Sequence, residues 1–232
     1  MKKSFIVAAI ILFVLIIDQA LKIWIKTHFA YGEEVKILGL DWALIHFVEN
    51  EGMAFGITFG GEYGKLALSL FRIAAVGFLF YYLRLLMRSQ VSFGLVVCFA
   101  LILAGALGNI LDSAFYGMIF SETPYHSGEV AKIFPPEGGY AGFLHGKVVD
   151  MFYFPMWEGF FPDWLPFWGG EHFLFFRPVF NLADASITMG VLSLLVFYRS
   201  FFSSHAEQVA KADAATTSDL PDVDLNKIQT EE

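Results

Sequence analysis

Charged residues are scarce in this chain of 232 residues, at 16% of the total, against 56% hydrophobic and 18% aromatic residues. A soluble globular domain usually carries about 25% charged residues. The single cysteine, Cys98, excludes an intrachain disulfide and a cysteine-rich metal site. The H-E-x-x-H pattern of zinc peptidases is missing, and His126, His145 and His172 have no tight ligand spacing. We therefore expect a membrane protein that needs neither a metal nor another cofactor.

Long hydrophobic runs are what the sequence has in place of charge. Each of four runs has about the 20 apolar residues that a helix needs to cross a bilayer. They cover about residues 4–25, 66–87, 91–111 and 179–198. The predicted fold class is an all-α integral membrane protein with four transmembrane helices. The first run lacks a small-x-small cleavage signature, so we expect a retained helix rather than a removed signal peptide.

Basic residues indicate which way the chain crosses the membrane. They lie before the first run, in the short turn between the second and third runs, and after the fourth. These residues are Lys2, Lys3, Arg84, Arg88 and Arg199. Because short loops rich in Lys and Arg stay in the cytoplasm, we predict that both termini are cytoplasmic. The long connections 26–65 and 112–178 are then on the outer, periplasmic face.

The two outer connections differ in character. In the first, the β-prone runs 35–40 and 42–48 are separated by a glycine and an aspartate, which predicts a small extracytoplasmic β-hairpin. The second is rich in Gly, Pro and aromatic residues, which predicts an interfacial aromatic loop lying on the membrane. Residues 1–205 are predicted to form one membrane domain, and residues 206–232 an acidic, disordered cytoplasmic tail.

Polar side chains recur at the outer ends of the predicted helices. Three pairs have helical spacing and therefore share a helix face. They are Asp18 with Lys22, Asn109 with Asp112, and Asn181 with Asp184. With the predicted topology, all three pairs lie near the outer membrane boundary, where Asp150 of the second connection can join them. A carboxylate close to hydrocarbon is costly to keep ionised, so Asp150 and Asp184 together suggest a shared proton.

Five short blocks, in order along the chain, form a specific pattern. They are DQALK at 18–22, NEGMAFG at 50–56, GALGNILD at 105–112, VVD at 148–150 and FNLADA at 180–185. In these blocks the chain resembles the bacterial lipoprotein signal peptidases (signal peptidase II), which are membrane aspartic proteases with four spans. The resemblance implies that Asp150 and Asp184 form a catalytic dyad. It also implies residues that shape the site or hold substrate: Asp18, Lys22, Asn50, Gly52, Gly108, Asn109, Asp112 and Asn181.

The chain lacks a positively charged residue that the family pattern has beside the site. The family usually has Arg directly after the aspartate that Asp112 matches, and this chain has Ser113. Lys147 and Arg177 are the candidate substitutes. Arg72, in the outer third of the second run, is predicted to be a snorkelling interfacial residue, with contact to a headgroup or a substrate carbonyl as the alternative.

The stretch between Asp112 and Asp150 is also longer than the family's usual few residues. Its insertion at 113–147 carries many aromatic residues among glycines and prolines. We predict an interfacial flap over the site, anchored by its rings, with Gly138, Gly139, Gly142 and Gly146 permitting motion.

Several polar residues also have a purely structural interpretation. Asp18 with Lys22 is explained equally by an ion pair between helices. Asn109 and Asn181 could be interhelical hydrogen-bonding residues. Asp184 could be a first-turn acid favoured by the helix dipole.

The intramembrane acids and the spans are also compatible with two other functions. A proton-coupled transporter also uses intramembrane carboxylates but normally places them near the bilayer midplane. A non-enzymatic membrane assembly factor would explain the spans but gives no reason for an acid pair.

The predicted function is an endopeptidase of the bacterial inner membrane, with its active site at the outer face. The acid pair indicates hydrolysis by a water held between Asp150 and Asp184. By the resemblance, the enzyme removes the signal peptide of a diacylglyceryl-modified prolipoprotein, just before the lipidated cysteine. The expected partners are this substrate and membrane lipid, with no nucleic acid, and the chain is expected to be a monomer.

Overall fold

The structure is a computed structural model that describes residues 2–51, 61–125, 127–175, 177–199 and 201. The chain forms two units, Met1–Val191 and Leu192–Glu232, and the elements below belong to the first unit except where α5 crosses the boundary. Two parts of the prediction lie outside the described residues. They are Gly52, with most of its sequence block, and the tail at 206–232.

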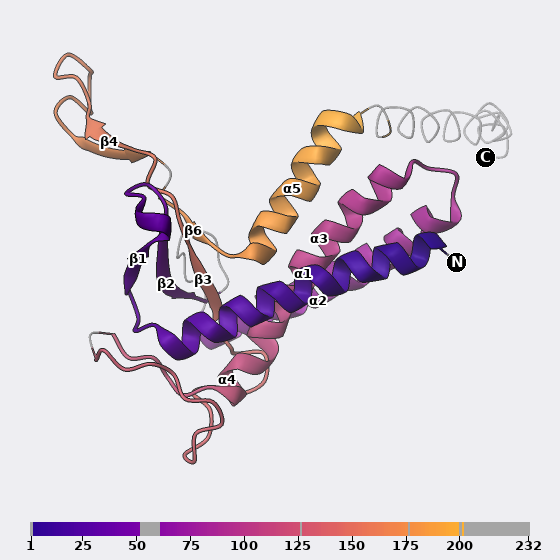
Figure 1. The fold of residues 1–232 in the computed structure, drawn as a ribbon, viewed down its shortest axis with the longest axis horizontal. Helices are drawn as coiled ribbons and strands as arrows, with labels where there is room; N and C mark the ends of the chain where they lie inside the picture. The colour runs from indigo at the N-terminus through magenta and orange to yellow at the C-terminus, as the bar shows by residue number, and fades with distance from the viewer. Residues whose placement is uncertain (1, 52–60, 126, 176, 200, 202–232) are drawn as a thin grey trace, which may run out of the picture. The chain divides into compact units, whose positions relative to one another are not determined.

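Long apolar helices dominate the first unit (Figure 1). They are α1 (Lys2–His28), α2 (Gly61–Arg88) and α3 (Phe93–Leu111), and α3 runs on through a π-helical turn, η3 (Asp112–Tyr116), into α4 (Gly117–Ile119). Within the described part of the chain, three stretches can cross a membrane by length and composition: Lys2–His28, Gly64–Arg88 and Phe93–Ile119. The first three predicted spans are therefore confirmed as long apolar helices.

The fourth apolar run is divided between a strand and a helix. Val179–Phe180 form strand β6, and helix α5 (Leu182–Phe197) follows after Asn181. Its 16 residues are apolar but fewer than the roughly 20 that cross a bilayer without thinning it. The predicted boundary at residue 179 is therefore wrong, because the first residues of the run pair with a neighbouring strand.

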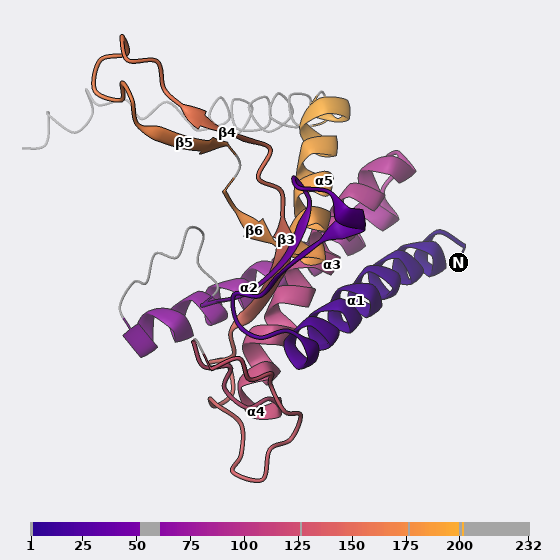
Figure 2. The ribbon, with the colours of Figure 1, turned by 60° about the vertical axis from the view of Figure 1, so that its left-hand side comes forward.

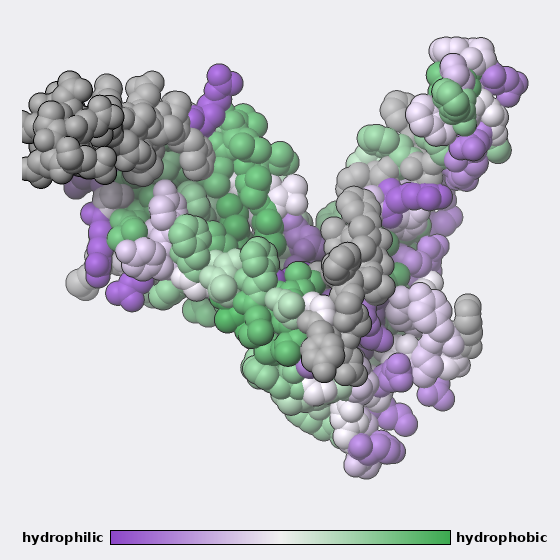
Figure 3. All heavy atoms as spheres, turned by 180° about the vertical axis from the view of Figure 1, so that it is seen from behind, coloured by the Kyte–Doolittle hydropathy of each residue, from purple (hydrophilic) through white to green (hydrophobic). Residues whose placement is uncertain are grey.

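Large hydrophobic side chains cover the outer surfaces of the helices. Phe13 on α1 is 66% exposed and Phe71 on α2 is 70% exposed. Figure 3 shows hydrophobic residues gathered over the helices and hydrophilic residues over the strands and loops. An apolar surface of this extent is favourable only against lipid or another apolar partner. The first unit therefore has the surface of a multi-pass membrane protein.

A four-stranded antiparallel sheet lies at one end of α1 (Figure 2). Its strands follow the order β1 (Glu34–Lys36), β2 (Leu44–Asn50), β3 (Val148–Tyr153) and β6. The β1–β2 pairing confirms the predicted hairpin, although residues 37–39 form the 3-10 turn η1 instead of continuing β1. The β2–β3 register pairs Val48 with Asp150, after a bulge, and so brings the two long connections together.

The sheet is larger than the hairpin that the sequence predicts. Residues 148–153, which the sequence places in a connection, form strand β3, and a second, separate hairpin joins β4 (Trp157–Phe160) to β5 (His172–Phe175). Val148 to Met151 are all buried, so both faces of β3 are covered. A strand buried on both faces lacks the alternation of apolar and polar residues by which strands are recognised.

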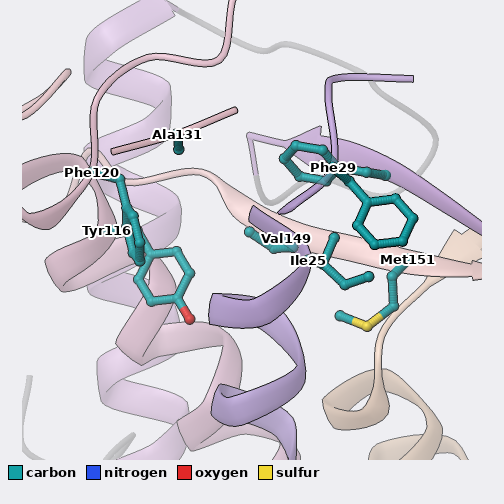
Figure 4. Packing of buried hydrophobic residues seen from close by; sticks show 8 residues of the cluster. Ile25, Phe29, Tyr116, Phe120, Ala131, Val149 and Met151 are labelled. Atoms are coloured by element: carbon teal, nitrogen blue, oxygen red, sulfur yellow. The ribbon is translucent and has the colours of Figure 1, made fainter. Parts of the chain in front are cut away.

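One hydrophobic cluster joins the sheet to the helix ends (Figure 4). Ile25 of α1 and Phe29, which directly follows α1, pack with Val149 and Met151 of β3, and Tyr116 of η3 belongs to the same cluster. Since successive side chains of a strand point to opposite faces, Val149 and Met151 face this core while Asp150 faces away from it. The core thereby fixes the direction in which the Asp150 carboxyl points.

Candidate active site

The first turn of α5 holds Asp184 through a reciprocal capping arrangement. The Asn181 side-chain Oδ1 accepts a hydrogen bond from the Asp184 backbone N at 2.9 Å, and Asp184 Oδ2 accepts one from the Asn181 backbone N at 3.4 Å. Asp18 of α1 supplies a further cap, because its Oδ1 accepts from the Ala183 backbone N at 2.9 Å. These bonds satisfy amide groups that a helix start leaves without partners, so the position of Asp184 is set by the start of α5.

Glycines of α3 allow α1 and α5 to come this close. A Cβ atom at Gly108 would lie 2.7 Å from Asp18 Oδ2 and 3.1 Å from Ala183 Cβ. At Gly105 it would lie 2.2 Å from the Ala183 carbonyl oxygen. Small residues at helix interfaces permit such close approach between membrane helices. Gly108 thus leaves the space in which the Asp18 carboxyl group approaches Ala183.

A buried charge cluster joins α1 to the end of α3. Lys22 Nζ lies 2.9 Å from Asp18 Oδ2 and 2.9 Å from Asp112 Oδ2, and these side chains are 0–1% exposed. Its third donor reaches Asn109 Oδ1 at 2.9 Å. All three hydrogens of the ammonium group therefore have acceptors, as a buried charge requires. Asp112 also accepts from the Val149 backbone N at 3.3 Å, which ties the cluster to β3.

Asp150 reaches the site from β3 and is 3% exposed. Its Oδ1 accepts a hydrogen bond from Asn181 Nδ2 at 2.7 Å, and its Oδ2 accepts one from Asn50 Nδ2 at 3.3 Å. Burial, and then the negative charge of Asp184, raise the pKa of Asp150 to about 7. Asp150 therefore keeps its proton in neutral solution much more readily than an ordinary aspartate.

Two asparagines connect the carboxyl groups of Asp150 and Asp184. Asn109 Nδ2 donates to Asp184 Oδ1 at 2.7 Å, and Asn181 Nδ2 donates both to Asp150 and, at 3.1 Å, to Asn109 Oδ1. The orientation of each amide is determined by its other partner. Lys22 can only donate, so Asn109 turns its oxygen to Lys22 and its nitrogen to Asp184. The backbone N of Asp184 fixes Asn181 in the same way.

The structure brings together residues from all the polar pairs and from both long connections. The predicted residues that meet in this one network are Asp18, Lys22, Asn50, Gly108, Asn109, Asp112, Asp150, Asn181 and Asp184. Across residues 2–51, 61–125, 127–175 and 177–199, no group of three or more His, Cys, Asp or Glu side chains is arranged to hold a metal ion.

Gln19 is a member of the site that the sequence interpretation left without a role. Its Nε2 donates to Asp112 Oδ1 at 2.8 Å, and its Oε1 accepts from the Tyr116 hydroxyl at 3.2 Å. It therefore occupies the second oxygen of Asp112, whose other oxygen binds Lys22. Two features of the sequence could have identified Gln19: it is a polar residue within an apolar helix, and it belongs to the first block, DQALK. The search for pairs with helical spacing matches Lys22 with Asp18, so it leaves Gln19 out.

The two candidate substitutes for the family arginine, Lys147 and Arg177, lie in surroundings different from those of Ser113. Lys147 Nζ lies 3.9 Å from Glu49 and over the Tyr140 ring, and Arg177 is exposed. The cation that does approach Ser113 comes from α2, where Arg72 Nη1 lies 3.5 Å from Ser113 Oγ.

The insertion after Asp112 is held against the helices by backbone hydrogen bonds. The carbonyl oxygen of Ser113 accepts from the Gly146 N at 2.8 Å, and that of Gly117 accepts from the Ala141 N at 2.9 Å. A Cβ atom at Gly146 would lie 2.1 Å from the Asp112 carbonyl oxygen. Gly146 therefore permits close packing against η3, and the first residues of the insertion are helical. The motion of a flap stays a prediction.

Comparisons of the sequence with family models and with known proteins agree on one family. The chain matches the family model of signal peptidase (SPase) II over residues 10–202. A lipoprotein signal peptidase of Porphyromonas gingivalis is 53% identical over 194 residues, covering 83% of this chain and 82% of that protein. One of Amoebophilus asiaticus is 35% identical over 221 residues, covering 94% and 86%.

A bacterial membrane enzyme solved by the in meso method at 1.9 Å resolution has a similar fold, with a TM-score of 0.51 and 23% identity over 82% of this chain and 90% of that one. With the family match spanning most of the chain and a close relative at half identity, the chain belongs to the signal peptidase II family and is a membrane peptidase.

Proposed function

We propose that this protein is an aspartic endopeptidase that removes the signal peptide from lipid-modified prolipoproteins, with Asp150 and Asp184 as its catalytic dyad. One observation carries the dyad assignment: two carboxyl groups from different elements share a pair of orienting amides, and one of them is buried with a raised pKa. Carboxyl groups held close in a poorly solvated place do not both ionise cheaply, so the pair keeps one proton. The substrate class rests on the relatives, which are lipoprotein signal peptidases.

Hydrolysis then needs one water between the two carboxyl groups. Asp184 lies in the first turn of α5, where negative charge is favoured. It takes a proton from the water while the water oxygen forms a bond to the scissile carbonyl carbon. Protonated Asp150 donates a hydrogen bond to the carbonyl oxygen and stabilises the negative charge that develops there. When the tetrahedral intermediate collapses, the C–N bond breaks and Asp184 returns its proton to the leaving amine. The products are a signal peptide with a new carboxyl group and a lipoprotein with a free amine, and Asp184 is ionised again.

The membrane arrangement that fits this chemistry has four spans, including α5, with both termini in the cytoplasm of a bacterial inner membrane. Arg84 and Arg88, at the turn between α2 and α3, support this orientation. The site residues lie near the other ends of α1 and α3, and so at the periplasmic face. A signal helix could lie in the bilayer beside α1 and α3 while the lipid of its cysteine enters sideways. The working form is proposed to be a monomer.

Cleavage of purified precursors tests the proposed function. The enzyme is expected to cleave a prolipoprotein carrying a diacylglyceryl cysteine and to leave the unmodified precursor intact. Asp184→Asn should be inactive on both. Asp41→Asn is the matched control, because Asp41 is an exposed acid paired with Lys36 outside the site. Equal cleavage of the two precursors would contradict the substrate class, and an active Asp184→Asn variant would contradict the dyad.

A further inference from the structure

A second buried ion pair lies one helical turn beyond Lys22 on α1. Lys26 follows Lys22 by four residues, so the two share a helix face. The Lys26 ammonium group pairs with the Glu49 carboxylate of β2, and these side chains are 0% and 2% exposed. A buried ion pair is often no better for stability than apolar residues of the same volume. The pair therefore points to a role in position rather than in stability.

Three kinds of contact hold the Lys26 ammonium group. Besides pairing with Glu49, Nζ donates to Thr123 Oγ1 at 3.1 Å. It also lies 5.1 Å from the centre of the Tyr140 ring and 5.5 Å from that of Phe120, and aromatic faces attract a cation. Thr123, Tyr140 and Phe120 belong to the insertion. The ammonium group is thus fixed between α1, β2 and the insertion.

The Glu49 carboxylate fastens the end of β2 to its neighbours. Its Oε1 binds Lys26, and its Oε2 lies 3.9 Å from Nζ of Lys147, the residue directly before β3. In the sheet, Glu49 is opposite Val149 of β3. One side chain therefore sets the place of this end of β2 relative to both α1 and β3.

Asn50, the next residue of β2, carries this position to the site. Successive side chains of a strand point to opposite faces. Glu49 shares the face of Val149, which packs in the hydrophobic cluster (Figure 4). Asn50 and Asp150 share the other face, where Asn50 Nδ2 donates to Asp150 Oδ2 at 3.3 Å. A shift of β2 at Glu49 would therefore move the Asn50 amide relative to the Asp150 carboxyl group.

We infer that Lys26 and Glu49 are positioning residues of the dyad: together they fix the end of β2 so that the Asn50 amide meets the Asp150 carboxyl group. This inference rests on the proposed dyad. The two residues act through Asn50 and not on the substrate. Their loss should therefore lower the rate of the chemical step and leave substrate binding unchanged.

Steady-state kinetics of the full-length enzyme on a lipidated precursor test this inference. Lys26→Met/Glu49→Gln removes both charges at once, so neither is left buried without its partner and the fold should persist. We expect kcat to fall about tenfold, the order of one hydrogen bond, while KM stays within about twofold. Lys36→Met/Asp41→Asn is the matched control, because it removes an exposed ion pair and should change neither constant.

Thermal unfolding in detergent shows which variants are folded. Glu49→Gln alone keeps the shape of the side chain and an oxygen for Lys26, so it is the milder second variant if the pair variant does not fold. Its kcat should fall by about threefold or more, with KM again unchanged. A folded variant of either kind with wild-type kcat would overturn the inference.

A double-mutant cycle with Asn50→Ala tests the route. Asn50→Ala should lower kcat by itself, and in that background Lys26→Met/Glu49→Gln should cause a further fall of no more than about twofold, because residues that act through one contact are not additive. A merely structural pair would lower kcat by the same factor in both backgrounds, and that result would overturn the inference.

Thr123→Val separates the strand from the insertion. It removes an acceptor of Lys26 in the insertion and leaves Glu49 in place, so kcat should be unchanged. A fall as large as that of the pair variant would overturn the route through Asn50. Asp184→Asn is measured alongside: an inactive variant shows that the dyad holds even if the inference fails, whereas an active one contradicts the proposed function itself.

Discussion

Replacement of Asn181 tests the network that orients both carboxyl groups. Asn181→Ala removes the cap of the Asp184 N, worth about 1 kcal/mol, and the donor to Asp150, worth about 2 kcal/mol for a hydrogen bond to a charged or strongly polarised group. Asn181 is 0% exposed, so water cannot replace these bonds. The free energy of unfolding should fall by about 3 kcal/mol, which lowers Tm by roughly 6–12 °C for a domain of this size.

The loss of activity should exceed what unfolding explains. At a temperature at which the variant remains folded, kcat should fall at least about 100-fold, since about 3 kcal/mol of orientation at the dyad corresponds to two powers of ten. Asn181→Asp keeps an oxygen to cap α5 but sets a carboxyl oxygen against the Asp150 carboxyl group in place of the Nδ2 donor, so it should be no more stable than Asn181→Ala and equally impaired in turnover.

Ser92→Ala is the matched control for the loss of a cap. Ser92 caps α3 far from the site, accepting from Leu95 N at 3.3 Å, so this variant should lose about 1 kcal/mol of stability and no turnover. Thermal unfolding in detergent and single-turnover cleavage of a lipidated precursor give the two quantities. Near-wild-type turnover in Asn181→Asp would refute the reasoning, because the amide would then not orient the dyad.

Further predictions concern pH, packing and topology. Burial and Asp184 raise the pKa of Asp150 to about 7, so the shared proton is kept below this pH and lost above it. We expect kcat/KM to fall about tenfold per pH unit on the alkaline side. A pH profile that is flat to about pH 9 would argue against a protonated Asp150. Gly108→Ala should cost about 1–3 kcal/mol through its contact with Asp18, whereas Gly77→Ala, with open space around it, should be harmless by the same thermal assay. In a Cys98→Ala background, a cysteine at position 127 should react with an impermeant outside reagent and one at position 89 should not; the reverse pattern would invert the topology.

Helical spacing was enough to predict the local pairs of the site but not the contacts between elements. Asp18 and Lys22 form the expected pair four residues apart, yet the third member, Asp112, comes from another helix. Spacing along one helix carries no information about which helix lies opposite. The family resemblance supplied what spacing could not, by naming residues from separate elements as one site.

The start of α5 could have been predicted from the sequence. Asn181 followed three residues later by Asp184 is a capping-box pattern, which marks a helix start directly after Asn181. The hydropathy of Val179 and Phe180 extended the predicted span over residues that pair with β3. Local capping chemistry was here a better guide to the boundary than hydropathy.

The insertion and the partner of Ser113 could not be predicted from pattern alone. A glycine such as Gly146 can permit motion or close packing, and the sequence does not distinguish the two. The close packing becomes visible only in the structure, where the Asp112 carbonyl oxygen lies next to Gly146. Arg72 looked like an interfacial residue because its sequence neighbours are apolar. Its direction depends on the docking of α2 against η3, which involves residues distant in the sequence.

The central claim is that Asp150 and Asp184 act as one unit. The most direct measurement is the single-turnover cleavage rate of Asp150→Asn, Asp184→Asn and the double variant on one lipidated precursor, with substrate binding measured in parallel. Each single variant should bind the precursor and cleave it at a negligible rate, and the double variant should be scarcely worse than either, because groups that act together are not additive. Cleavage near the wild-type rate by either single variant, or losses that multiply in the double variant, would contradict the account.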